Sequence, residues 1–131
     1  MNIHDGNYLG SGRLLSNVLN NNGALLDATM FDLRIFEQNG CVNAVAKFTP
    51  IRCRELGSDL ELTLLQVAKV DFYHDETHSF YLIERYTFFE MSDGQFYLSL
   101  DPYHEVEVPH EEDGGIFIAK EVHGSLILKN K

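Results

Sequence analysis

The sequence predicts an all-β domain, an antiparallel meander of about seven or eight strands that forms a barrel or a sandwich. Short stretches in which apolar and polar residues alternate indicate strands, because successive side chains of a strand face opposite sides of the sheet. Turn-forming residues separate these stretches at short, fairly even intervals. That spacing is typical of meanders, sandwiches and barrels.

The candidate strands follow from this alternation and from the turn signals between them. We expect strands at 13–19, 26–37, 41–49, 60–73, 79–91, 95–101, 115–122 and 125–129. The turns are expected at Asn20–Gly23, Asn39–Gly40, Gly57–Asp59, His74–His78, Asp93–Gly94, Asp101–Pro102, Asp113–Gly115 and His123–Gly124.

Residues 79–101 are the most informative stretch, since Asp93–Gly94 between two alternating runs predicts a β-hairpin. Its first arm is apolar on both faces. One face would carry Phe80, Leu82, Glu84, Tyr86 and Phe88, and the other Tyr81, Ile83, Arg85, Thr87 and Phe89. Such a strand belongs in the middle of a sheet covered on both sides, or in a barrel wall with something packed outside it.

A second hairpin is predicted around Asn39–Gly40. In the strand before this turn, Phe31, Leu33 and Ile35 would share one face, and Met30, Asp32, Arg34 and Phe36 the other.

The stretch 58–72 allows two interpretations. Ser58 and Glu61 have the spacing of a capping box, and Leu60, Leu64, Leu65 and Ala68 could form a helical stripe. A helix near 59–70 would make the fold α+β. We favour a strand, because leucines at 60, 62 and 64 alternate with Glu61 and Thr63 and no helix stop signal follows.

The chain has 131 residues, near the common size of one domain, so we expect a single domain over 1–131. It has no apolar run approaching the length of a transmembrane helix, and it begins without a basic region followed by an apolar stretch. We therefore expect no membrane association and a cytoplasmic location. Self-association is open, and both a monomer and a homodimer remain compatible with the sequence.

Acidity is the strongest global hint at function. Twenty Asp and Glu against ten Lys and Arg give a formal charge of −10. Nucleic-acid binding is disfavoured, because it requires Lys/Arg clusters that the chain lacks. A basic protein partner fits this charge, although acidity can also serve solubility alone.

The stretch from Asp101 to Gly115 carries six acidic residues and two prolines, and we expect an exposed connection there. Its acidic side chains are the candidates for partner binding: Asp101, Glu105, Glu107, Glu111, Glu112 and Asp113.

No pattern predicts a metal site or a cofactor. The run from His74 to His78 has two histidines four apart, but Asp75 stands where a zinc-protease helix needs glutamate, and a polar turn is the simpler interpretation. Carboxylates near His104 and His110 could assist in binding a divalent ion. His74, His78, His104 and His110 are thus weak metal candidates only.

Cys41 and Cys53 lack metal-site spacing, and we interpret them as free thiols.

No residue is predicted to be catalytic, because no nucleophile, base or phosphate-loop motif is present. Glu84 and Arg85 each interrupt an apolar face of the expected central strand, and one of them should point inward. A buried ion pair is their simpler role. If a cavity lies beside this strand, a polar site could instead be formed by Glu84, Arg85, Tyr81 and Tyr86. Burial would then raise the pKa of the Glu84 carboxyl.

Three functions are compatible with these features. The first is a non-enzymatic binding protein that recognises a basic protein, as an immunity or inhibitor protein does. The second is a barrel or cup that binds a small apolar ligand, favoured by nine phenylalanines and six tyrosines. The third is a small hydrolase or isomerase built on such a cup, which no diagnostic residue pair supports. The charge favours the first.

Overall fold

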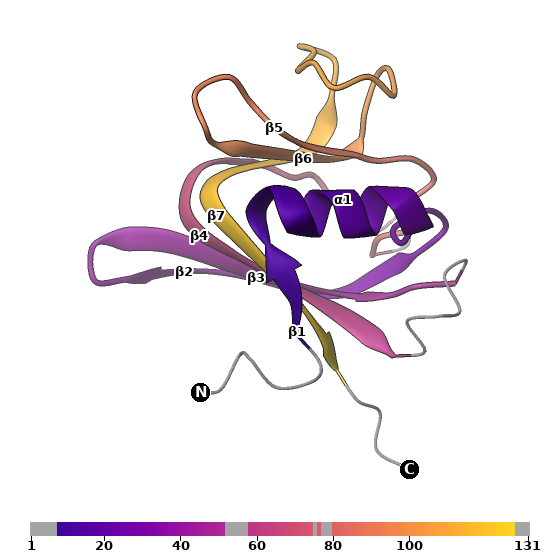
Figure 1. Cartoon of the computed structure of the whole chain (residues 1–131), viewed down its shortest axis with the longest axis horizontal. Helices are drawn as coiled ribbons and strands as arrows, with labels where there is room; N and C mark the ends of the chain where they lie inside the picture. The colour runs from indigo at the N-terminus through magenta and orange to yellow at the C-terminus, as the bar shows by residue number, and fades with distance from the viewer. Residues whose placement is uncertain (1–7, 52–57, 75, 77–79, 128–131) are drawn as a thin grey trace.

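A strongly curved antiparallel sheet forms the body of the molecule, and a helix lies against it (Figure 1). The computed structural model describes residues 8–51, 58–74, 76 and 80–127. In that part of the chain the elements are β1 (Tyr8–Ser11), α1 (Gly12–Asn22), β2 (Thr29–Gln38), β3 (Cys41–Thr49), β4 (Asp59–Asp71), β5 (Thr87–Glu90), β6 (Phe96–Asp101) and β7 (Gly114–Ile127).

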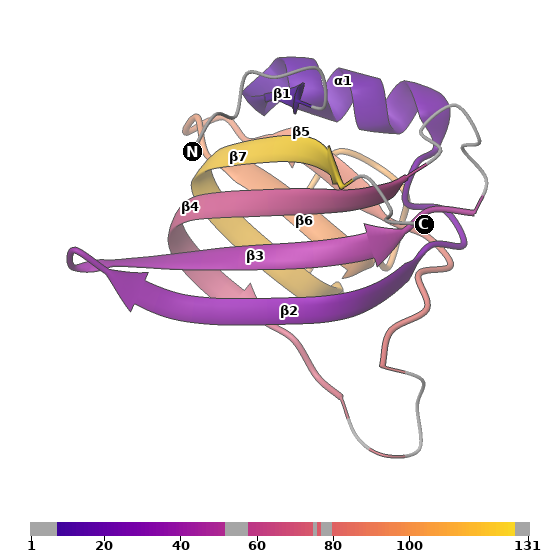
Figure 2. The ribbon, with the colours of Figure 1, turned by 90° about the horizontal axis from the view of Figure 1, so that it is seen from below.

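The seven strands have the order β2-β3-β4-β7-β6-β5, and β1 pairs with β7 outside this path. Figure 2 shows β2, β3, β4 and β7 side by side in front, with β5 and β6 behind them and α1 along one side. The predicted antiparallel, mainly β fold is confirmed. The sheet curves like part of a barrel, but it ends at β2 and β5 and is not closed.

The stretch around residues 59–70 is strand, as favoured from the sequence, and not helix. Leu60, Leu62 and Leu64 in β4 are at most 1% exposed and face the core. They lie opposite Phe48, Ala46 and Ala44 of β3, whose predicted bounds of 41–49 are confirmed.

The strand predicted at 13–19 is wrong, because these residues form helix α1. Leu15 and Leu19, four positions apart, are both completely buried on one face of the helix. The predicted turn at Asn20–Gly23 is the end of this helix, where Gly23 adopts the left-handed conformation with φ of 60°. Among the described residues, no helix has the length and apolar character that crossing a membrane requires.

The C-terminal part of the sheet is one strand, not two strands with a turn at His123–Gly124. Strand β7 runs without a break through Gly124, pairing with β4 along one edge and with β6 and then β1 along the other. Gly124 gives α1 room at this point. A Cβ atom there would lie 2.5 Å from Leu15 Cδ1, so the completely buried Leu15 side chain would have to shift.

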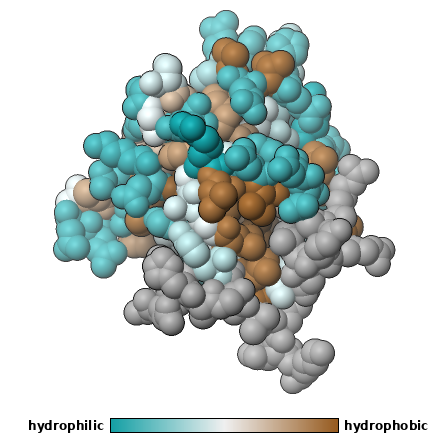
Figure 3. Space-filling view, viewed as in Figure 1, coloured by the Kyte–Doolittle hydropathy of each residue, from teal (hydrophilic) through white to brown (hydrophobic). Residues whose placement is uncertain are grey.

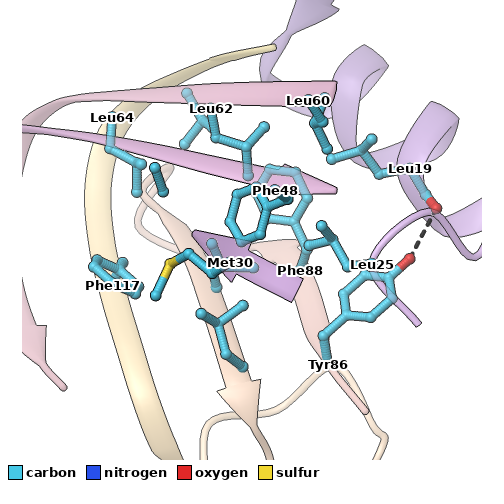
Figure 4. Close-up of a cluster of buried hydrophobic side chains, with 14 of the residues drawn as sticks. Leu19, Leu25, Met30, Phe48, Leu60, Leu62, Leu64, Tyr86, Phe88 and Phe117 are labelled. Atoms are coloured by element: carbon cyan, nitrogen blue, oxygen red, sulfur yellow. Dashed lines mark hydrogen bonds between the residues drawn. The ribbon is translucent and has the colours of Figure 1, made fainter. Parts of the chain in front are cut away.

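The concave side of the sheet encloses the main core (Figure 4). Its largest completely or almost completely buried side chains include Phe48, Phe88 and Phe117, and burying each contributes about 1.5–3 kcal/mol. Tyr86 reaches this core with its ring, and its hydroxyl donates a 2.8 Å hydrogen bond to the Leu19 carbonyl. The bond joins the sheet side of the core to the end of α1.

The hairpin around Asp93–Gly94 is confirmed, with the Gly94 N–H donating to the Met91 carbonyl at 2.9 Å. Its first arm is much shorter than the predicted 79–91, because β5 begins only at Thr87. The residues before it pair elsewhere. The Met30 N–H donates to the Tyr81 carbonyl and the Ile83 N–H to the Ala28 carbonyl, so this segment lies beside the start of β2.

The tight crossing of α1 over β7 predicts that Gly124→Ala lowers the free energy of unfolding by about 1–3 kcal/mol, because the new methyl group overlaps Leu15. Urea denaturation measures the loss. Gly114→Ala, at the other end of β7, is the matched control, since a Cβ atom there makes only ordinary contacts of 3.5 Å or more. Equal losses in both variants would contradict the proposed crossing.

Candidate functional site

The acidic loop, which we define as residues 102–113, connects β6 to β7 and is attached to the sheet by its last residue. Asp113 is only 8% exposed. Its Oδ2 accepts hydrogen bonds from the Tyr97 hydroxyl at 2.6 Å and the His110 N–H at 2.9 Å. Its Oδ1 accepts one from the Tyr103 N–H at 2.8 Å. The side chain therefore ties both ends of the loop to strand β6.

These hydrogen bonds decide the protonation of Asp113. Burial by itself raises the pKa of this carboxyl, but the hydrogen bonds from Tyr97, Tyr103 and His110 outweigh it and hold the pKa below its usual value. On the other side of the pair, burial and then the bond to Asp113 raise the pKa of the Tyr97 hydroxyl. At neutral pH the pair is thus an ionised carboxylate and a neutral phenol.

Stacked rings hold the loop closed at its base. The His110 ring stacks on Tyr103 with centroids 4.4 Å apart and planes 20° apart, and His104 meets Tyr103 edge-on at 4.6 Å. His110 Nδ1 accepts a hydrogen bond from the Glu112 N–H, and the carbonyl of buried Pro102 accepts one from Arg85. A loop held in this way loses little conformational entropy when it binds a partner.

The outer surface of the acidic loop alternates between negative and apolar side chains. Glu105, Glu107, Glu111 and Glu112 are exposed, as predicted. Among them lie Val106 and Val108, which are 52% and 63% exposed. In Figure 1 this light-orange loop lies at the top of the molecule, where Figure 3 shows brown side chains among teal ones. Exposed apolar groups ringed by charge are characteristic of protein-binding surfaces.

Beneath the loop, a second apolar cluster covers the outer face of the sheet. Phe89, Tyr97 and Ile116 are its buried members, with Met91 and Ile118 packed against them. Because Phe88 and Leu98 face the main core instead, β5 and β6 are apolar on both sides. This hairpin carries apolar side chains packed on both faces, but the predicted central position of the arm 79–91 is wrong. Only Thr87–Glu90 of that arm form a strand here, and β5 is the last strand of the sheet.

Two cavities flank the acidic loop. The loop cavity, of about 300 Å³, lies between the loop and the outer face of β4 and β7. The helix cavity, of about 530 Å³, lies between α1 and the β5–β6 hairpin and is reached by Glu107. In the helix cavity Arg13 already pairs with Glu90, with Nη2 2.8 Å from Oε1.

The polar group predicted around residue 84 does not form. Glu84 and Arg85 are both exposed rather than one pointing inward, because no strand continues through them and the alternation is interrupted there. Tyr86 is buried in the main core, and Tyr81 is half-buried, where burial followed by nearby Asp101 raises the pKa of its hydroxyl. None of these four residues lines either cavity.

The acidic candidates divide into two groups. Asp101 is exposed at the end of β6, like the four glutamates, whereas Asp113 is buried, contrary to the exposed rim expected from the sequence. Tyr97 and Tyr103 were missed as the partners of Asp113. These hydrogen bonds form because the chain folds back and brings Asp113 next to β6, and no local sequence pattern predicts that contact.

The weak metal candidates lie in two separate parts of the chain. His74 is exposed and meets Phe80 edge-on, and His78 lies outside the described residues. His104 and His110 contact each other and Tyr103. Within the described ranges, no group of three or more His, Cys, Asp or Glu is arranged to hold a metal ion. Cys41 is a free thiol, and Cys53 also lies outside these ranges.

Asp113→Asn is predicted to lower the free energy of unfolding at neutral pH by about 1–3 kcal/mol, because buried hydrogen-bond donors lose a charged acceptor. Since the folded-state pKa of Asp113 is lowered, its contribution is complete above the unfolded pKa of about 4 and disappears as the pH falls further. The difference from the wild type should therefore shrink in acid, as measured by urea denaturation across pH. Glu112→Gln, the exposed neighbour, is the control and should change stability little; an equal loss there would contradict the assignment.

The chain was compared with protein-family models, with curated proteins and with solved structures. None of the three comparisons found a match. The function must therefore be inferred from the chain's own residues.

Proposed function

We propose that this domain is a non-enzymatic binding protein that recognises a basic protein partner through the acidic loop, in the manner of an immunity or inhibitor protein. The observation that carries the proposal is the exposed run of glutamates and valines on a loop anchored by buried Asp113. The formal charge of −10 adds a long-range attraction for a positive surface.

Charge and apolar contact would have separate roles in such binding. The glutamates would steer a positive partner toward the loop and speed the encounter, an effect that salt screens. Val106 and Val108 would then be buried against the partner, and this exclusion of water from apolar surface would slow dissociation. The anchored base of the loop keeps both kinds of group in one arrangement before contact.

Two features limit the proposal to binding by this surface. The concave side of the sheet, where a cup would hold an apolar ligand, is filled by Phe48, Phe88 and Phe117. Glu84, the residue considered for an acid–base role, is exposed and lines neither cavity. We therefore extend the proposal neither to a small-molecule carrier nor to a reaction.

The proposal predicts that Glu105→Gln, Glu107→Gln and Glu112→Gln together abolish or strongly reduce the capture of a basic partner. Immobilised wild type and variant are exposed to the same cell extract at low ionic strength, and retained proteins are identified by mass spectrometry. A partner should be basic, should be retained by the wild type and should be released by added salt.

The matched control is Glu37→Gln, Glu76→Gln and Glu121→Gln, which removes the same charge from exposed positions outside the loop. This control should retain the partner. If both variants lose the partner equally, binding depends only on net charge. If both retain it equally, the loop glutamates do not take part in binding. Either result overturns the proposal.

A further inference from the structure

We propose that the loop cavity is a pocket for one arginine side chain of the basic partner. This inference rests on the proposed function and adds to it the chemical group that the partner inserts. The cavity volume of about 300 Å³ is at the low end of ligand pockets, which is suited to a single side chain.

The floor of the loop cavity is apolar. Met91, Ile116 and Ile118 line it, and they belong to the cluster that covers the outer face of the sheet. An arginine side chain has three methylene groups before its guanidinium group, and such stems pack along apolar surface while the charged end stays polar. The floor therefore fits the stem of the side chain.

Carboxylates stand on two sides of this floor. Asp71 ends β4 beside Ile116 of β7, and Glu111 belongs to the acidic loop that forms the opposite wall. Neither forms an ion pair with a Lys or Arg of the described chain. A guanidinium group can donate from several N–H groups in one plane, so it can bond to carboxylates on both walls.

Lys69, which also lines the cavity, is the group that opposes this charge pattern. Its ammonium pairs with neither carboxylate in the described structure. The Lys69 ammonium would repel a bound guanidinium group. The proposal therefore predicts that replacing Lys69 by a neutral residue makes binding tighter.

The helix cavity is larger but carries a different pattern. Its own Arg13 already donates two hydrogen bonds to Glu90, from Nε at 3.0 Å and from Nη2 at 2.8 Å. A cation from the partner would compete with this pair. The loop cavity is therefore the one whose carboxylates are available to a partner.

The test uses the whole chain with methyl-labelled Ile and Met, titrated with N-acetyl-L-arginine N-methylamide and followed by NMR. The methyl signals of Met91, Ile116 and Ile118 should shift, whereas those of Ile35 and Ile83, which do not line the cavity, should not. The citrulline analogue, with the same shape but no charge, should leave all of them in place. Equal shifts with citrulline would overturn the proposal.

Three variants sharpen the test. Asp71→Asn with Glu111→Gln should raise the Kd for the arginine analogue about tenfold. Glu37→Gln with Glu121→Gln removes the same charge elsewhere and should leave the Kd unchanged. Lys69→Gln should lower it. An unchanged Kd in the first variant, or a raised Kd in the last, counts against the pocket, and the remaining methyl signals report whether each variant is folded.

This titration needs no partner protein, so its failure is distinct from failure of the proposed function. Capture that depends on the loop glutamates, without any shift from the arginine analogue, would retain the binding function and reject the pocket. Specific shifts at the pocket, without any loop-dependent partner, would retain the cation site and reject the proposed function.

Discussion

Strand β7 pairs along both of its edges, and this pairing positions the other parts of the fold. This strand joins β4 on one side to β6 and β1 on the other, so the two ends of the curved sheet are connected through it. Gly124 within β7 lets α1 approach closely, and Leu15 then enters the core. This contact, together with the Tyr86 hydrogen bond to the Leu19 carbonyl, holds α1 against the core.

The candidate binding surface depends on the same strand at its other end. Asp113 immediately precedes β7, so the residue that anchors the acidic loop is fixed by the sheet register at Gly114. A buried carboxylate is unfavourable unless it is fully hydrogen-bonded, and Tyr97, Tyr103 and His110 meet that requirement. These three hydrogen bonds favour this arrangement of the loop over others that keep Asp113 buried, because those would leave its charge without partners.

Charge in this segment therefore has two physical roles. The ionised Asp113 is a structural group, whereas the neighbouring glutamates remain in solvent with their charges available to a partner. The apolar cluster on the outer face of the sheet links the two, because it supports the loop from below and also forms the floor of the loop cavity. Stability of the loop and recognition of a cation would thus depend on adjacent but different side chains.

Features that arise from neighbours along the chain could be predicted from the amino-acid sequence. Alternation placed β3 and β4, glycine-containing turns placed both hairpins, and composition located the exposed acidic residues. Alternation misled at residues 13–19, where Leu14, Leu15, Val18 and Leu19 also fit a helical repeat.

Features that depend on contacts between residues far apart in the chain could not be predicted in this way. The tertiary structure exposes Glu84 and Arg85 by pairing the preceding residues with the start of β2. It keeps Gly124 inside a strand by pairing β7 with β4 and β1 at this position. It also buried Asp113 beneath Tyr97 while leaving Glu111 and Glu112 in solvent. Acidic residues that are neighbours in the sequence therefore differ in burial, because their burial depends on which distant strand the chain packs against. That packing is determined by burial of the common hydrophobic core.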